Sequence, residues 1–118
     1  MRAEEFKART KAFAVRVVRL VESLPGRRSA DVLGRQLLRS ATSVGANYRA
    51  ACRAQSRPAF IAKLSIVEEE CDEAIYWMEI LIEAGIVREP LLADLRAEAN
   101  EILSMIVASL KTARRGSK

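Results

Sequence analysis

Residues 60–81, FIAKLSIVEEECDEAIYWMEIL, carry the clearest structural signal in the chain. Apolar residues recur here at alternating intervals of four and three: Phe60, Leu64, Val67, Cys71, Ala74, Met78 and Leu81. This spacing is typical of a helix that presents one apolar seam to its neighbours, as in bundles and coiled coils. The stretch therefore predicts a long helix that packs along one face.

Three further segments show helical spacing, and none shows the alternation of a strand. Their apolar faces comprise Phe6, Phe13, Val17, Leu20 and Leu24; Leu33, Leu37, Ala41, Val44, Tyr48 and Ala51; and Leu92, Leu95, Ala99, Ile102 and Ile106. Short breaks at 25–26, 55–58 and 85–90 separate the four segments. Long helices with short connections favour an all-α, antiparallel up-down-up-down four-helix bundle.

Residues at the breaks also indicate where helices start and stop. Ser29 or Asp31 is placed to cap the second helix, and Ser56 to cap the third. Gly85 suits the end of the third helix, and Pro90 suits the start of the fourth.

Length and composition indicate one soluble domain. The 118 residues fit a single bundle over residues 1–113, followed by a basic tail over 114–118. We expect no membrane association, because no apolar run approaches the roughly 20 residues that span a bilayer. We expect a cytoplasmic protein, because no signal peptide is recognised and the cysteines are few. Cys52 and Cys71 should lie too far apart along the bundle to form a disulfide.

The chain has no histidine, which removes the commonest general base and a common metal ligand. We therefore expect no enzymatic activity. The acidic run EEECDEA at 68–74 places Glu69, Asp72 and Glu73 within one helical turn of each other, but a single helix supplies nearly all the carboxylates. A solvated or ion-paired face is the better interpretation, and we expect neither a metal nor a cofactor.

A row of arginines marks the second helix. The stretch 35–57 holds five arginines and no acidic residue, and at 100° per residue all five fall within an arc of about 80°. These residues are Arg35, Arg39, Arg49, Arg53 and Arg57. Like charges one turn apart repel each other, so something anionic should lie near this face.

Two kinds of anion are open as the partner of this row. Residues 58–101 contain eleven acidic residues, so carboxylates such as Glu69, Glu70 or Glu73 could pair with the arginines in the same or a neighbouring subunit. The alternative partner is the phosphate backbone of RNA or DNA. No aromatic residue interleaves with the arginines, so such binding should be weakly selective for sequence and strongly dependent on salt.

A second apolar stripe lies on the third helix, away from its seam. Ile66, Trp77 and Ile80 cluster there among glutamates. A helix of an isolated bundle needs one apolar face, and a stripe with a tryptophan suits a subunit interface. We expect a homo-oligomer with these residues at its interface, although Trp77 could instead cover the edge of its own bundle.

The run QLLRSATSVGAN, residues 36–47, resembles the 23S rRNA intervening-sequence proteins, a bacterial family of four-helix bundles. Matching positions include Arg39, Ser43, Val44 and Asn47, and the resemblance continues through SRPAFIAKLSIVEEECDEA at 56–74. A more distant resemblance is to the accessory protein of diversity-generating retroelements. Many members have Glu-Gly soon after the asparagine, where this chain has Tyr48-Arg49-Ala50-Ala51.

The resemblance implies a homo-oligomer, in particular a pentamer, with no established catalysis. It also suggests a packing or assembly role for Gln36, Ser40, Ser43 and Asn47, and we assign Ser43 and Asn47 to the oligomer interface. The leading functional hypothesis is an oligomeric module that binds RNA or DNA through the arginine row, alone or beside a nucleic-acid-processing protein. The alternative is a protein-binding or scaffold oligomer whose arginines are used in salt bridges.

Overall fold

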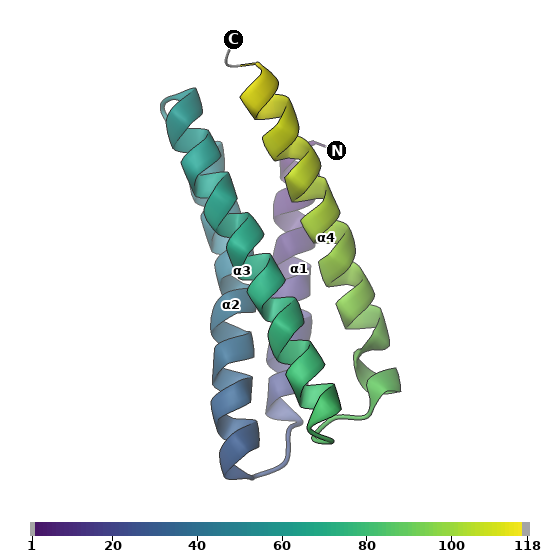
Figure 1. Cartoon of the computed structure of the whole chain (residues 1–118). Helices are drawn as coiled ribbons and strands as arrows, with labels where there is room; N and C mark the ends of the chain where they lie inside the picture. Colours follow the sequence, from purple (N-terminus) through teal and green to yellow (C-terminus); the bar gives the residue numbers. More distant parts are fainter. Residues whose placement is uncertain (1, 117–118) are drawn as a thin grey trace.

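The computed structural model describes residues 2–116, which fold into four helices and form a rod of 50 × 20 × 20 Å (Figure 1). The helices are α1 (Ala3–Glu22), α2 (Arg28–Cys52), α3 (Arg57–Glu83) and α4 (Glu89–Arg115). Short turns connect them, so successive helices run in opposite directions. The predicted all-α up-down-up-down bundle is confirmed.

The helices form a ring in chain order. Each of α2 and α3 packs against both of its chain neighbours, and the ring closes where α1 meets α4 along its least extensive contact. Helix α2 approaches α1 closely because Gly45 faces Thr10: a Cβ at Gly45 would lie 3.2 Å from the Thr10 Oγ1. One flank of α2 therefore faces α1, and the opposite flank faces α3.

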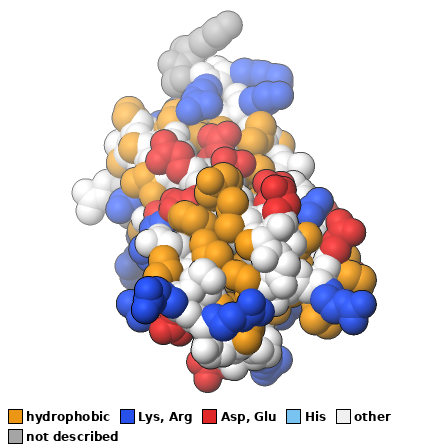
Figure 2. Space-filling view, turned by 60° about the horizontal axis from the view of Figure 1, so that its bottom comes forward, with side chains coloured by type: hydrophobic (Ala, Val, Ile, Leu, Met, Phe, Trp, Pro, Cys, Tyr) orange, Lys and Arg blue, Asp and Glu red, His pale blue; other side chains and the backbone are white. Residues whose placement is uncertain are grey.

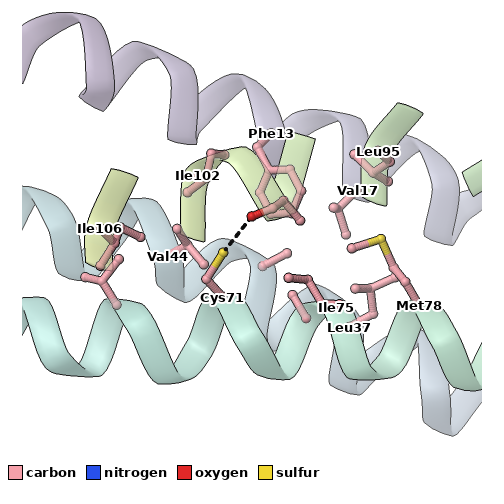
Figure 3. Packing of buried hydrophobic residues seen from close by; sticks show 14 of the residues in the cluster. Phe13, Val17, Leu37, Val44, Cys71, Ile75, Met78, Leu95, Ile102 and Ile106 are labelled. Carbon is pink, nitrogen blue, oxygen red and sulfur yellow. Dashed lines mark hydrogen bonds between the residues drawn. The ribbon is translucent and has the colours of Figure 1, made fainter. Parts of the chain in front are cut away.

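The predicted seams form the core (Figure 3). On α3, every seam residue from Leu64 to Leu81 is fully buried, and Phe60 at the start of the helix is half-buried. Cys71 lies in the middle of this core and donates its thiol hydrogen to the carbonyl of Ala99 on α4, at 3.4 Å. Burial raises the pKa of Cys71 to about 12, so this thiol is inert. Both cysteines are free, as predicted.

The helix ends agree with the sequence at three of the four predicted points. The Ser56 hydroxyl caps α3 by accepting a hydrogen bond from the Ala59 amide at 3.2 Å. Gly85 ends α3 with a φ of 73°, and Pro90 lies in the first turn of α4. The predicted cap of α2 is wrong. That helix begins at Arg28 without a side-chain cap, so Ser29 and Asp31 lie inside its first turn.

At the C-terminal end, α4 continues to Arg115, so the first two residues of the predicted basic tail are helical. Residues 117–118 lie outside the described part of the chain. Within residues 2–116, no helix combines the length and the apolar character needed to cross a membrane.

Candidate nucleic-acid interface

The structure divides the predicted arginine row into paired and unpaired residues. Arg39 leans toward α3, where its guanidinium binds Glu70 at 3.2 Å and also contacts Glu73. Arg35 lies 3.7 Å from Asp31, one turn back on α2, and both side chains are well exposed. One arginine of the row, Arg39, is therefore paired with the acidic face of α3.

The remaining three arginines form no ion pair with any residue of the described chain, and all are exposed. Arg49 is in the last turn of α2, and Arg53 is the residue that ends this helix. The expectation that Arg57 continues the row on the same helix is wrong. The chain turns after Cys52, and Arg57 is the first residue of α3.

Arg49 borders a shallow groove between α1 and α2 that contains two lysines. The floor is made of small residues, Ala14, Thr42, Gly45 and Ala46, and the basic side chains are Lys7, Lys11 and Arg49. Lys7 also forms an ion pair with Glu4, in which the Lys7 Nζ lies 2.9 Å from the Glu4 Oε2. Sequence reasoning missed the lysines, although their four-residue spacing already placed them on one face of α1. We call this feature the α1–α2 groove.

Beyond the groove lies one end of the rod, where α2 ends, α3 begins and α4 ends. The segments 41–67 and 102–116 meet here and carry seven basic residues without any acidic one. The Arg57 guanidinium lies beside Gly116: a Cβ at Gly116 would be 3.2 Å from its Nη1. Lys111, Arg114 and Arg115 belong to the last two turns of α4. Figure 2 shows a group of basic side chains at the top of the view, at this end of the rod, and others around the opposite end, which is turned toward the viewer.

We refer to this end of the rod as the cationic pole, comprising Arg53, Arg57, Lys111, Arg114 and Arg115. Two acidic residues of α1 lie near this pole, and each is paired with a basic residue of its own segment. Glu4 binds Lys7, and the Glu5 Oε1 lies 3.4 Å from the Arg2 Nε. Arg114 also reaches α3, where its Nη2 lies 3.4 Å from the Ser65 hydroxyl. The other half of the rod contains most of the acidic residues, since ten of the eleven in 58–101 occur from Glu69 onward. The charge is thus polarised along the rod.

The small polar residues of α2 lie on the flank opposite Gly45, toward α3. Ser40 is fully buried, and its hydroxyl donates to the carbonyl of Gln36 on its own helix at 3.0 Å. Asn47 is half-buried and donates its amide hydrogen to the carbonyl of Ser43 at 3.0 Å. Their polar groups are therefore satisfied within α2, and the small side chains allow α2 and α3 to pack closely.

The second apolar stripe of α3 is partly covered within the chain. Trp77 is half-buried, packs edge-to-face on Tyr76 at 5.1 Å between ring centroids, and lies 3.4 Å from Glu73 through its indole nitrogen. Ile80 is half-buried, whereas Ile66 is 37% exposed. Among the residues of 2–116, no group of three acidic or thiol side chains is placed to hold a metal ion.

The comparisons with known proteins agree with this architecture. The family model of the 23S rRNA-intervening sequence protein matches residues 4–108. Among solved structures, the chain is similar to a protein of unknown function of the S23 ribosomal protein family from Bacteroides thetaiotaomicron. That likeness has 36% sequence identity and a TM-score of 0.87, and it covers 94% of this chain and 99% of the other. No curated protein matches the chain.

Proposed function

Because the chain belongs to the 23S rRNA-intervening sequence protein family, we propose that it is a non-enzymatic module that binds the phosphate backbone of RNA or DNA. The binding surface runs from the α1–α2 groove to the cationic pole. This differs from a ridge along the whole of α2, because Arg35 and Arg39 already have carboxylate neighbours. The cytoplasm suits a chain with two free thiols.

The observation that carries the proposal is the set of exposed arginines without carboxylate partners at one end of the rod. Arg49, Arg53 and Arg57 bear no ion pair with the described residues, and the segments around them contain no acidic residue. Unneutralised like charges repel each other, and the phosphates of a bound polyanion would relieve this repulsion by their opposite charge. The release of counterions from the polyanion would favour binding further. The groove floor of Gly45, Ala46 and Ala14 leaves the backbone of a nucleic acid room to approach.

The alternative is a protein-binding scaffold whose arginines are used in salt bridges between helices or subunits. Within the described residues, Arg39 is the one member of the row that makes such a bridge, since Arg35 pairs within its own helix. The contacts of Arg39 with Glu70 and Glu73 join α2 to α3 within one chain. Both candidates are compatible with an accessory role beside a nucleic-acid-processing protein.

We further propose that the chain assembles into a homo-oligomer through the α3 stripe, a pentamer being what the family resemblance implies. Ile66 is an exposed apolar side chain one turn before Glu69 and Glu70, and Trp77 lies about three turns further along the same side of α3. Such patches are typical of interfaces between subunits. Ser43 and Asn47 remain candidates for this interface, since each is half-buried in the single chain.

Removing charge at the groove end tests the nucleic-acid proposal. Arg49→Gln combined with Arg53→Gln should weaken binding of a generic RNA oligonucleotide at low salt. It should also reduce the slope of log Kobs against log[salt] by roughly 1.5, since each lost phosphate contact contributes about 0.7 to 0.9. The measurement is fluorescence anisotropy over a salt series.

Arg27→Gln combined with Arg28→Gln is the matched control, because it removes the same charge from exposed residues at the opposite end of the rod. This control should leave the slope nearly unchanged. Equal effects of the two double variants would mean that net charge alone drives binding. An unchanged affinity in the Arg49/Arg53 variant would exclude the proposed surface.

A further inference from the structure

A large open pocket lies at the cationic pole, and its volume of about 800 Å³ is in the range of small-molecule sites. Its walls come from all four helices and the α2–α3 turn. Small apolar side chains line most of it, including Ala51, Ala54, Ala108 and Ala113. The aromatic rings of Tyr48 and Phe60 also line the pocket, and Arg57 lies on it.

The pocket lies where α4 extends beyond the level of the start of α1. Arg9 on α1 lies opposite Glu98 and Glu101 on α4. In an antiparallel pair, Ala3 is then level with about residue 107, while α4 continues to Arg115. Helix α4 thus extends roughly 12 Å beyond the level of Ala3, and apolar side chains of the other helices line the pocket at this end of the rod.

Because this apolar pocket lies beside the basic residues of the cationic pole, we infer that the pocket receives an unstacked base of single-stranded nucleic acid. The cationic pole then holds the adjacent phosphates. The inference rests on the proposed function and specifies its substrate class: a single strand in preference to a duplex, whose bases are stacked inside. Aromatic faces beside an arginine-rich surface are the usual means by which proteins bind single strands.

The polarity of the lining suits a base. A base is a flat, weakly polar ring with hydrogen-bonding edges. Here the apolar alanine walls and the Phe60 ring are accompanied by the hydroxyls of Ser56, Ser109 and Thr112. Tyr48 is held in place by an edge-to-face contact with Phe6, at 4.7 Å between ring centroids. Phe60, at the start of α3, lies one turn from Arg57, so one strand could place a base on the ring and a phosphate on the guanidinium.

The experiment compares three oligonucleotides of equal length by fluorescence anisotropy at fixed salt: a thymidine strand, its abasic counterpart and a duplex. The abasic strand has the same phosphates without the rings. For the unmodified protein we expect the thymidine strand to bind about tenfold tighter than the abasic strand, which is the order of one stacked base.

Two variants act on the pocket in different ways. Phe60→Leu removes the aromatic face but keeps an apolar side chain, and Ala108→Phe fills the pocket from an exposed position on α4. Both should bring the affinity for the thymidine strand down to that for the abasic strand and leave duplex binding unchanged. Ala97→Phe, also exposed on α4 but outside this pocket, is the matched control and should retain the tenfold preference.

Cys52 provides a second measurement, because it lines the pocket whereas Cys71 is fully buried. The thymidine strand should slow modification of Cys52 by a thiol reagent, and the abasic strand should not. Equal binding of intact and abasic strands would overturn the inference but keep the proposed function. If the protein binds none of the three oligonucleotides, both the inference and the proposed function are wrong.

Discussion

Where α1 packs against α4, the guanidinium of one arginine binds two carboxylates. Arg9 donates from Nε and Nη2 to Glu98 at 2.7 and 2.8 Å, and from Nη2 to Glu101 at 2.7 Å. Hydrogen bonding to Arg9 lowers the pKa of Glu98, and the same bonds raise the pKa of Arg9 above its ordinary value. This three-residue cluster bridges the least extensive helix contact of the bundle.

Glu98→Gln should destabilise the protein by about 1.5 kcal/mol at pH 7, since it removes a charge-assisted pair of hydrogen bonds. The folded-state pKa of Glu98 is depressed, so its contribution is fully present above the unfolded value of about 4.3. That contribution is lost as the pH falls through the folded pKa, where the wild-type carboxyl becomes neutral. Urea unfolding at pH 7 and at acidic pH should show the difference between variant and wild type shrinking.

Glu101→Gln is the control for this prediction. The Glu101 side chain is 69% exposed, whereas that of Glu98 is 19% exposed, so solvent screens its interaction with Arg9. Glu101→Gln should therefore lower the free energy of unfolding by well under half as much as Glu98→Gln. A difference for Glu98→Gln that stays constant down to strongly acidic pH would show that charge is not what this residue contributes.

At the scale of the elements, the end of α3 depends on one backbone conformation. Gly85 adopts a φ of 73°, which side-chain-bearing residues rarely do. The amide of the next residue, Ile86, then bonds back to the Leu81 carbonyl at 3.0 Å. This closes the helix in the way typical of a Schellman motif and sends the chain toward α4.

Gly85→Ala should lower the free energy of unfolding by roughly 1 kcal/mol, because of strain in the left-handed conformation. A Cβ at this position would meet nothing within 4 Å, so the cost is purely conformational. Gly26→Ala is a matched control: its Cβ would also meet nothing within 4 Å, and its φ is not in the positive range. It should be neutral or slightly stabilising, since it restricts the unfolded chain. Urea midpoints that shift equally for the two variants would contradict this account.

At the scale of the whole molecule, the two surfaces for which we propose roles lie on different parts of the rod. The cationic pole lies at one end of the rod, and the apolar stripe of Ile66, Trp77 and Ile80 runs along the outer side of α3. Assembly through the stripe would repeat the basic surface in every subunit. Several copies acting together would raise the apparent affinity for a long nucleic acid beyond that of one site.

Light scattering during size-exclusion chromatography tests the assembly. We expect a mass well above that of one 13.1 kDa chain at micromolar concentration. Ile66→Lys should shift the population toward the monomer, since it places a charge in the apolar contact. Leu91→Lys is the matched control, because Leu91 is 70% exposed at the start of α4, away from the stripe. A monomeric wild type would contradict the proposed assembly.

The sequence by itself determined the four helices, their seams and three of their ends. Those features depend on local periodicity: a residue such as Val67 or Met78 is assigned to the core by its spacing from its neighbours on the same helix. Ser56 and Gly85 likewise act through groups within a few residues. The periodicity also located the arginines, since it gave their direction around the helix axis.

Only the tertiary structure decided which of those arginines are available. Arg39 and Arg49 belong to the same row, yet one leans toward the glutamates of α3 and the other toward the lysines of α1. The pocket that joins Phe60 and Tyr48 to Arg57 was equally hidden, because its lining comes from all four helices and the α2–α3 turn. Pairing and cavities depend on which helices lie side by side and in what register, and no spacing within one helix contains that information.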